Sequence, residues 1–153
     1  MQEFVQLLER KNLCFRNFYK LCEKFVEEIK KGDATNLELF QIQRQGLINV
    51  LEKIEADVMV YLQSHQENPA LLDSLFTDEI KTQVQQLLRE KDGLLNEIIL
   101  IDTIILRDVD ALKKDTIQKL HTIQTGRKTI QAYRSPLSQV ESAVGPKLVD
   151  REA

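Results

Sequence analysis

Apolar side chains recur every three or four residues through almost the whole chain. This spacing covers residues 2–31, returns from about residue 36 to residue 65, and returns again from residue 78 to about residue 134. Only 5 Gly and 3 Pro interrupt 153 residues, whereas a many-stranded sheet needs a turn about every 8–12 residues. The sequence therefore predicts an all-α protein, an antiparallel bundle or coiled coil of three long helices in which the third is the longest.

Residues that favour helix ends lie between these three segments. Gly32 suits the left-handed position that ends a helix, and Thr35 or Asn36 can cap the next one. The pair Asn68-Pro69 predicts a break, followed by a short helical turn that closes the end of the bundle. Thr77 is the expected cap of the third helix.

The third helix is too long for the other two to cover. Residues 78–134 would span about 85 Å as a helix, against about 45 Å for each of the others. We therefore expect the second half either to project past the bundle or to bend near "RDVDALKKD". The predicted domains are a helical bundle, residues 1–134, and a C-terminal partner-binding segment, residues 135–153.

The last segment has the pattern of a short amphipathic helix. Ser135 can cap it, Pro136 suits its first position, and Gly145-Pro146 would end it. Its apolar face consists of Leu137, Val140, Val144 and Leu148. A helix this short is marginal in water, so we expect it to become ordered against a partner's groove. The alternatives are that it docks on its own bundle or stays disordered.

The stretch "EIILIDTIIL" in the third helix is apolar nearly all the way round. Two neighbouring helices cover only part of such a cylinder. One interpretation is deep core. The other is a self-association surface on Ile98, Ile101 and Ile105 that makes a homodimer.

Positive charge is concentrated late in the chain, although the whole chain carries a net charge of −3. Residues 113–134 hold six Lys and Arg against Asp115 alone. The pattern fits either a solvated helix face or a patch for an acidic partner. Nucleic acid is not an expected partner, because Tyr133 is the one aromatic residue that could stack among these charges.

No catalytic or metal-binding pattern is present in the sequence. There are two His and two Cys, without phosphate-loop, nucleophile-elbow or dinucleotide motifs. A phosphorelay centred on His121 is a weak alternative, since Gly126 follows five residues later and off the matching face. Cys14 and Cys22 lie about 12 Å apart along one helix, too far for a disulfide. We expect a non-enzyme without cofactors or metal.

The chain begins without the basic and apolar regions of a signal peptide, and no run reaches 18 apolar residues. Together with unpaired cysteines, this predicts a cytoplasmic protein without stable membrane insertion.

Four stretches give the chain a resemblance to a known family. They are "LLERKNLCFRNFYKLCEKFVEEIKKGD", "INVLEKIEAD", "LLREKDGLLNEI" and "GRKTIQAYR". With the layout of three helices and an amphipathic tail, the chain resembles the FlgN-type flagellar export chaperones over essentially its full length.

The resemblance implies a cytoplasmic chaperone of type III flagellar export. It would hold the hook-associated proteins of the hook–filament junction and deliver them to the export gate. By the same resemblance, Leu137, Val140, Val144 and Leu148 would bind the substrate protein, and Tyr133 would contact the gate. The alternative function is a structural or adaptor coiled-coil protein that self-associates through its third helix.

Overall fold

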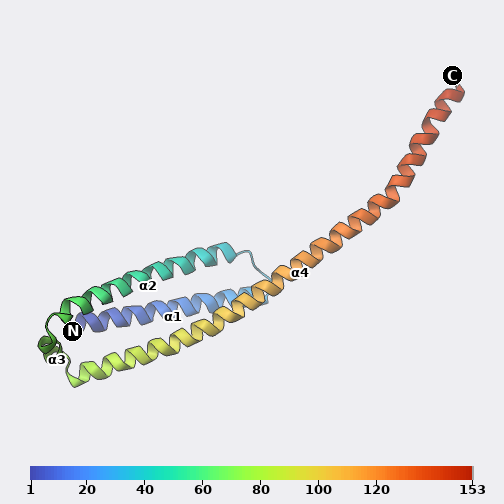
Figure 1. Ribbon diagram of the computed structural model, residues 1–153. Coiled ribbons are helices and arrows are strands. Elements are labelled where there is room, and N and C mark those ends of the chain that lie inside the picture. Colours follow the sequence, from blue (N-terminus) through green and yellow to red (C-terminus); the bar gives the residue numbers. More distant parts are fainter. Residues whose placement is uncertain (153) are drawn as a thin grey trace. The chain divides into compact units, whose positions relative to one another are not determined.

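The computed structural model describes the backbone of residues 1–152 and the side chains of residues 1–71 and 73–133 (Figure 1). Four helices make up this part of the chain: α1 (Gln2–Lys30), α2 (Leu37–Gln66), α3 (Pro69–Leu75) and α4 (Asp78–Glu152). No strand occurs among residues 1–152. The prediction of an all-α protein is therefore confirmed.

The helix ends follow the local chemistry of the sequence. Gly32 has φ +77°. Its N–H donates to the Ile29 carbonyl at 2.8 Å, and the Asp33 N–H donates to the Glu28 carbonyl at 3.1 Å. These two bonds satisfy carbonyls that the end of α1 leaves without a helical partner. The predicted left-handed glycine is thus confirmed.

The caps of the next helices differ from each other. Thr77 caps α4, because its Oγ1 accepts a hydrogen bond of 3.4 Å from the Ile80 N–H. Asn36 precedes α2 without a side-chain capping bond. Thr35 bonds to Asp33 instead, and the hydroxyl and N–H that it donates lower the pKa of that carboxyl group. The expected side-chain cap of α2 by Thr35 or Asn36 was therefore wrong.

The structure corrects the prediction that a separate short helix begins at Ser135-Pro136 and ends at Gly145-Pro146. α4 continues through "RDVDALKKD" and past Pro136 and Pro146 without interruption. Proline fixes φ near the helical value and removes one N–H donor, so it weakens a helix locally without requiring it to end.

By its packing, the chain divides into two units, Met1–Val109 and Asp110–Ala153. The boundary lies inside α4. The division into a helical bundle, residues 1–134, and a partner-binding segment, residues 135–153, stays a prediction.

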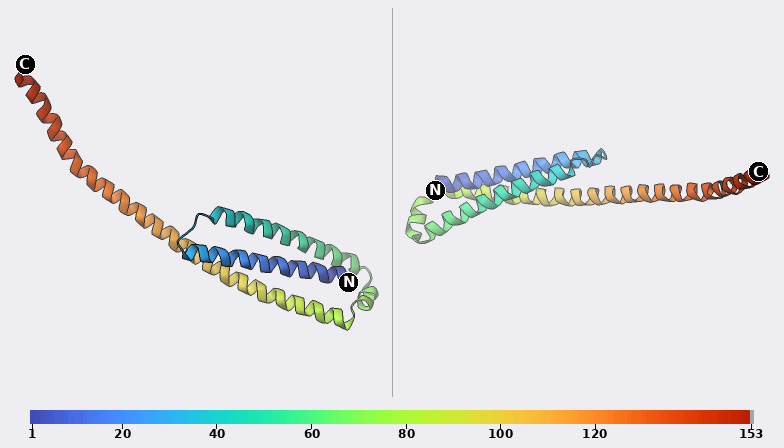
Figure 2. Two further views of the ribbon diagram at one scale, coloured as in Figure 1. Left: turned by 180° about the vertical axis from the view of Figure 1, so that it is seen from behind. Right: turned by 90° about the horizontal axis from the view of Figure 1, so that it is seen from above.

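Within the first unit, α1 lies against both α2 and the first part of α4 (Figure 2). One buried cluster joins the start of α1 to the end of α2: it contains Phe4, Leu7, Leu8, Ile54, Val58 and Tyr61. A second cluster joins the end of α1 to the start of α2 and to α4: it contains Phe15, Phe18, Cys22, Phe25, Val26, Ile29, Phe40, Ile98, Ile101 and Ile105. These pairings make α2 run opposite to α1, and α4 run in the same direction as α1.

A buried polar contact between α1 and α4 fixes how the two helices are aligned. Asn12 is 2% exposed. Its side-chain amide donates to the Leu87 carbonyl at 2.9 Å and to Glu90 at 3.3 Å. Arg16 also pairs with Glu90. A shift of one residue between the helices would leave the amide buried without its partners, which is costly, so these contacts fix the register.

Candidate partner-binding surfaces

In the second unit, α4 carries an exposed row of aliphatic side chains. Ile117, Leu120, Ile123 and Ile130 are 56%, 54%, 52% and 55% exposed. They are separated by three, three and seven residues, so they share one side of the helix. We call this row the α4 stripe. A soluble helix ordinarily turns such a row towards a core, so the α4 stripe is a surface suited to a partner helix.

Basic side chains accompany the α4 stripe. Residues 110–133 contain five Lys and Arg against two Asp, a net charge of +3. Two pairs lie four residues apart, Lys114 with Asp110 at 3.0 Å and Lys119 with Asp115 at 2.9 Å. Such exposed pairs contribute little to stability. The remaining positive charge would favour a partner with acidic side chains beside its apolar face.

Tyr133, the expected gate contact, lies at the end of the described side chains and is 75% exposed. The four residues of the predicted substrate-binding face lie on α4, but their side chains are outside the described residues. They are Leu137, Val140, Val144 and Leu148.

The structure corrects the predicted self-association surface. Ile98, Ile101 and Ile105 are 8%, 7% and 4% exposed. They pack into the second buried cluster, where the aromatic residues of α1 and Phe40 of α2 cover them. The exposed aliphatic residues of this stretch are instead Ile99, Leu100 and Leu106, at 61%, 66% and 72%.

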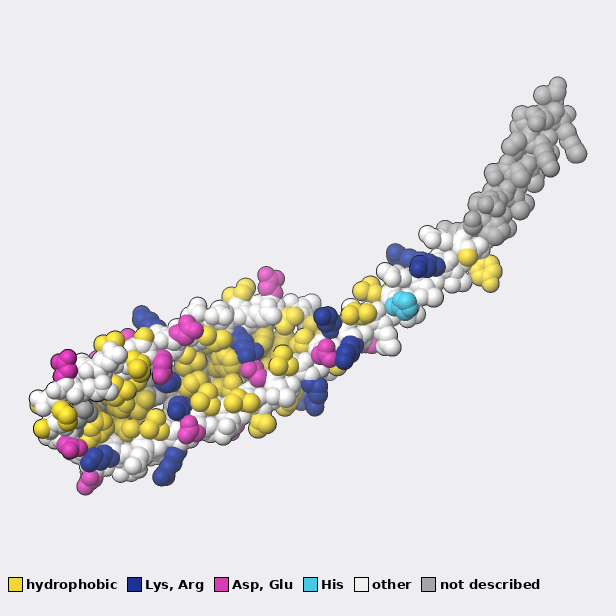
Figure 3. Space-filling view, viewed as in Figure 1, with side chains coloured by type: hydrophobic (Ala, Val, Ile, Leu, Met, Phe, Trp, Pro, Cys, Tyr) yellow, Lys and Arg dark blue, Asp and Glu magenta, His cyan; other side chains and the backbone are white. Residues whose placement is uncertain are grey.

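A second apolar surface lies between α2 and the first part of α4, where Figure 3 shows a band of hydrophobic side chains in a furrow. Arg44 of α2 reaches Asp102 of α4 across it at 2.6 Å. Residues spaced by whole helical turns from this pair share its side of each helix. We call this surface the α2–α4 face. Its apolar residues are Ile48, Leu51, Met59 and Leu62 of α2 and Leu88, Leu95 and Ile99 of α4.

The α2–α4 face is only partly covered. Met59, Leu88 and Ile99 are 49%, 40% and 61% exposed, and the other four are half-buried. Lys11 of α1 interrupts the apolar pattern of its helix and pairs with Glu55 of α2. Its long side chain extends to the carboxylate at the surface while its stem covers apolar neighbours.

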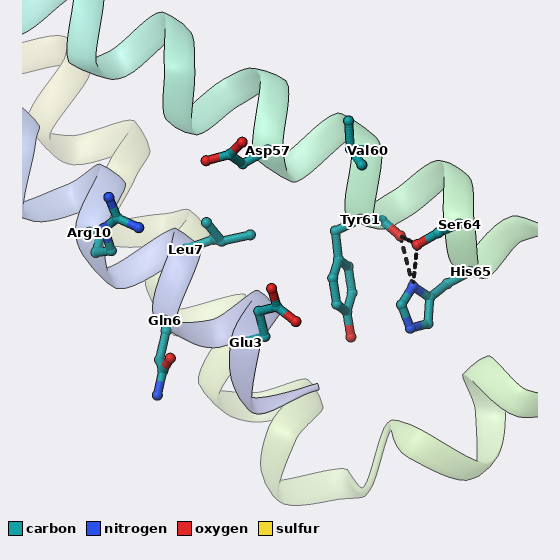
Figure 4. A pocket seen from close by; sticks show the side chains of 9 residues that line it. All are labelled: Glu3, Gln6, Leu7, Arg10, Asp57, Val60, Tyr61, Ser64 and His65. Atoms are coloured by element: carbon teal, nitrogen blue, oxygen red, sulfur yellow. Dashed lines mark hydrogen bonds between the residues drawn. The ribbon is translucent and has the colours of Figure 1, made fainter.

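A pocket of about 560 Å³ lies between the start of α1 and the end of α2 (Figure 4). It is lined by Glu3, Gln6, Leu7, Arg10, Asp57, Val60, Tyr61, Ser64 and His65. The His65 ring stacks on the ring of Tyr61 with 4.1 Å between centroids. Burial, and then the charge of Glu3, raises the pKa of the Tyr61 hydroxyl.

Ser64 and His65 do not form a nucleophile–base pair in this pocket. The Ser64 hydroxyl donates to the Tyr61 carbonyl at 2.8 Å. The same carbonyl lies 2.8 Å from Nδ1 of His65, so this nitrogen carries the proton and cannot accept one from Ser64, 3.0 Å away. The contacts instead hold the last turn of α2 together.

Both cysteines are buried and unpaired, as the sequence predicts. Burial raises the pKa of the Cys14 thiol. The pKa of the Cys22 thiol is raised to about 11, first by burial and then by the charge of Asp102. A thiol is a nucleophile only when ionised, so burial disfavours reaction at both cysteines in the folded protein.

Sequence reasoning did not find the cross-helix polar contacts. Lys11 was visible as a gap in an apolar pattern, but its partner Glu55 lies 44 positions later. Arg44 and Asp102 are 58 positions apart and resemble ordinary surface charges in the sequence. Each of these contacts depends on how the helices are paired.

Among the described residues, no helix has the length and apolarity that crossing a membrane requires. The described side chains also contain no group of three His, Cys, Asp or Glu suited to a metal ion. No protein-family model, curated protein or solved structure matches the chain.

Proposed function

We propose that this protein is a cytoplasmic chaperone of type III flagellar export, which binds hook-associated proteins and delivers them to the export gate. The observation that carries the proposal is the α4 stripe, whose four aliphatic side chains are each more than half exposed. It is joined by the sequence resemblance to FlgN-type chaperones. Leu137, Val140, Val144 and Leu148 would extend the binding surface, and Tyr133 would contact the gate.

The mode of binding follows from the composition of α4 beyond Asp110. A client segment with an apolar face would pack on the α4 stripe as one helix against another. Basic residues beside the stripe would attract acidic residues beside the client's apolar face and speed their encounter. Covering the client's apolar face would prevent it from aggregating before export.

Release from such a site would need no chemical step. Ordering a flexible client segment costs conformational entropy, which offsets part of the contact free energy. The contact would therefore be weak enough for the export gate to compete with it. The first unit, which we propose is a three-helix antiparallel bundle, would serve as the folded support for α4.

Capture of hook-associated proteins tests this proposal. Full-length protein is compared with a chain that ends at Arg134 and with the double variant Leu120→Glu/Ile123→Glu. Thr122→Glu is the control for position, since it adds a single negative charge on the other side of the helix. We expect the control to bind normally and the double variant to bind at least tenfold more weakly, because it places charge in an apolar contact.

The chain that ends at Arg134 separates the two parts of the proposed surface. Loss of capture by this chain would assign binding to the predicted tail residues. Normal capture by every variant would contradict the proposed binding surface. No capture by the full-length protein would contradict the export role.

A structural or adaptor coiled-coil protein is the second candidate function. The exposed Ile99, Leu100 and Leu106 of the first unit favour it, because aliphatic side chains this exposed commonly mark contact surfaces when they cluster. This function predicts that the protein assembles with itself, as a homodimer also would, and it differs from the export role in predicting no specific client.

A further inference from the structure

The α2–α4 face has the form of a site for one more helix. Its walls are two helices joined by the Arg44–Asp102 ion pair, and its exposed apolar residues include Met59, Leu88 and Ile99. α2 has 30 residues and is therefore about 45 Å long. A helix of similar length could lie along it and cover these residues, as helices do in a four-helix bundle.

Charge indicates which helix would occupy this face. Residues 1–109 carry 13 Lys and Arg against 19 Asp and Glu, a net charge of −6. The occupant should therefore be apolar on one side, and a positive net charge would favour its approach to this negatively charged unit. Residues 110–133 have both properties, with the α4 stripe on one side and a net charge of +3.

Charge also disfavours the simpler symmetric pairings. Two α4 stripes side by side would bring two positively charged helices together, and two α2–α4 faces would bring two negatively charged units together. Placing the stripe of one copy on the face of another joins opposite charges. When both copies do this, each apolar surface is covered once and the two contacts are equivalent.

We propose that the chain forms a reciprocal homodimer, in which the α4 stripe of each copy lies on the α2–α4 face of the other. Ile98, Ile101 and Ile105 have no direct part in this contact, because they belong to the core of each copy. The dimer requires no client protein and is tested without one. It covers the α4 stripe, so the partner copy and a client would compete for that surface.

Sedimentation equilibrium of the purified full-length protein tests the dimer. A stripe variant, Leu120→Glu/Ile123→Glu, and a face variant, Met59→Lys/Ile99→Lys, should each raise the dissociation constant about tenfold or more. All four positions are about half exposed or more, so these changes should leave the fold intact. Circular dichroism checks that they do.

Two control variants add charge of the same sign outside the proposed contact, one charge each. Thr122→Glu lies on the other side of the helix from the stripe, and Ile42→Lys lies on a different side of α2, where Ile42 is 63% exposed. Both should keep the dissociation constant of the unchanged protein within about twofold. Raising the salt concentration should weaken the dimer, since opposite charges draw the copies together.

Mixing the stripe variant with the face variant distinguishes reciprocal pairing from other dimers. In the mixed pair, one contact is unchanged and the other sets new Glu side chains against new Lys side chains. We expect the mixture to form dimers at concentrations at which each variant alone is mostly monomeric. A monomeric unchanged protein, a dimer insensitive to either variant, or a mixture that stays monomeric would each overturn the proposal.

Discussion

Truncating two neighbouring residues of α4 to alanine should have very different effects on stability. Ile101 is 7% exposed in the second buried cluster, whereas Leu100 is 66% exposed. Ile101→Ala removes three carbon atoms from a buried site, which costs about 2.4 kcal/mol at about 0.8 kcal/mol per carbon. The cavity left behind increases this cost, while the better helix propensity of Ala offsets about 0.4 kcal/mol.

The expected loss for Ile101→Ala is therefore about 2 to 4 kcal/mol in the free energy of unfolding. Leu100→Ala removes the same number of carbons, but only about a third of that side chain is covered. We expect it to cost about 0.5 kcal/mol or less. The difference between the two losses in free energy of unfolding, rather than either loss alone, shows which side of α4 faces the core.

Urea unfolding followed by tyrosine fluorescence measures this difference in the first unit. The chain has no Trp and three Tyr, of which Tyr133 lies in the second unit. Placing both variants in a Tyr133→Phe background leaves Tyr19 and Tyr61 as the reporters. Equal losses, or a larger loss for Leu100→Ala, would refute the burial of Ile101 and restore it as a candidate surface residue.

Three further predictions concern single sites of the first unit. Asn12→Ala should lower the free energy of unfolding by about 1 to 2 kcal/mol, because it removes a buried hydrogen bond, and urea titration would show no such loss if the amide were solvated. Gly32→Ala should lower the free energy of unfolding by about 1 kcal/mol, because Gly32 has a positive φ. Gly46→Ala should raise it by about 0.5 to 1 kcal/mol, because no atom beyond the adjoining backbone of α2 lies within 4 Å of the added carbon. Thermal unfolding of the two variants should therefore show changes of opposite sign. Folding raises the pKa of the Cys22 thiol from 9.0 to about 11, so the folded state holds the thiol proton more tightly than the unfolded state does. The contribution of the protonated thiol to the free energy of unfolding is therefore full below pH 9 and is lost as the pH rises towards 11. The difference in free energy of unfolding between the unchanged protein and Cys22→Ala should therefore become smaller as the pH rises from 9 to 11. A difference that stays constant would contradict the burial of the thiol.

Local patterns in the sequence determined the helices of this protein. The three-to-four-residue spacing of apolar side chains identified α1, α2 and most of α4 because a helix repeats on that period. Gly32 and Thr77 marked helix ends because each acts on backbone groups a few positions away. The breaks expected at Pro136 and Pro146 were wrong, because proline in an otherwise helical stretch weakens a helix without requiring it to end.

The direction in which each apolar residue points was decided by tertiary structure. The stretch that contains Ile98 and Ile99 is apolar on all sides, so its pattern could not say which residues form the core. Packing against α1 and Phe40 buries Ile98 and leaves Ile99 exposed. The Arg44–Asp102 and Lys11–Glu55 pairs, and the α2–α4 face beside them, exist only once helices distant in sequence lie side by side. Periodicity depends on neighbours along the chain, whereas a surface depends on which helices meet.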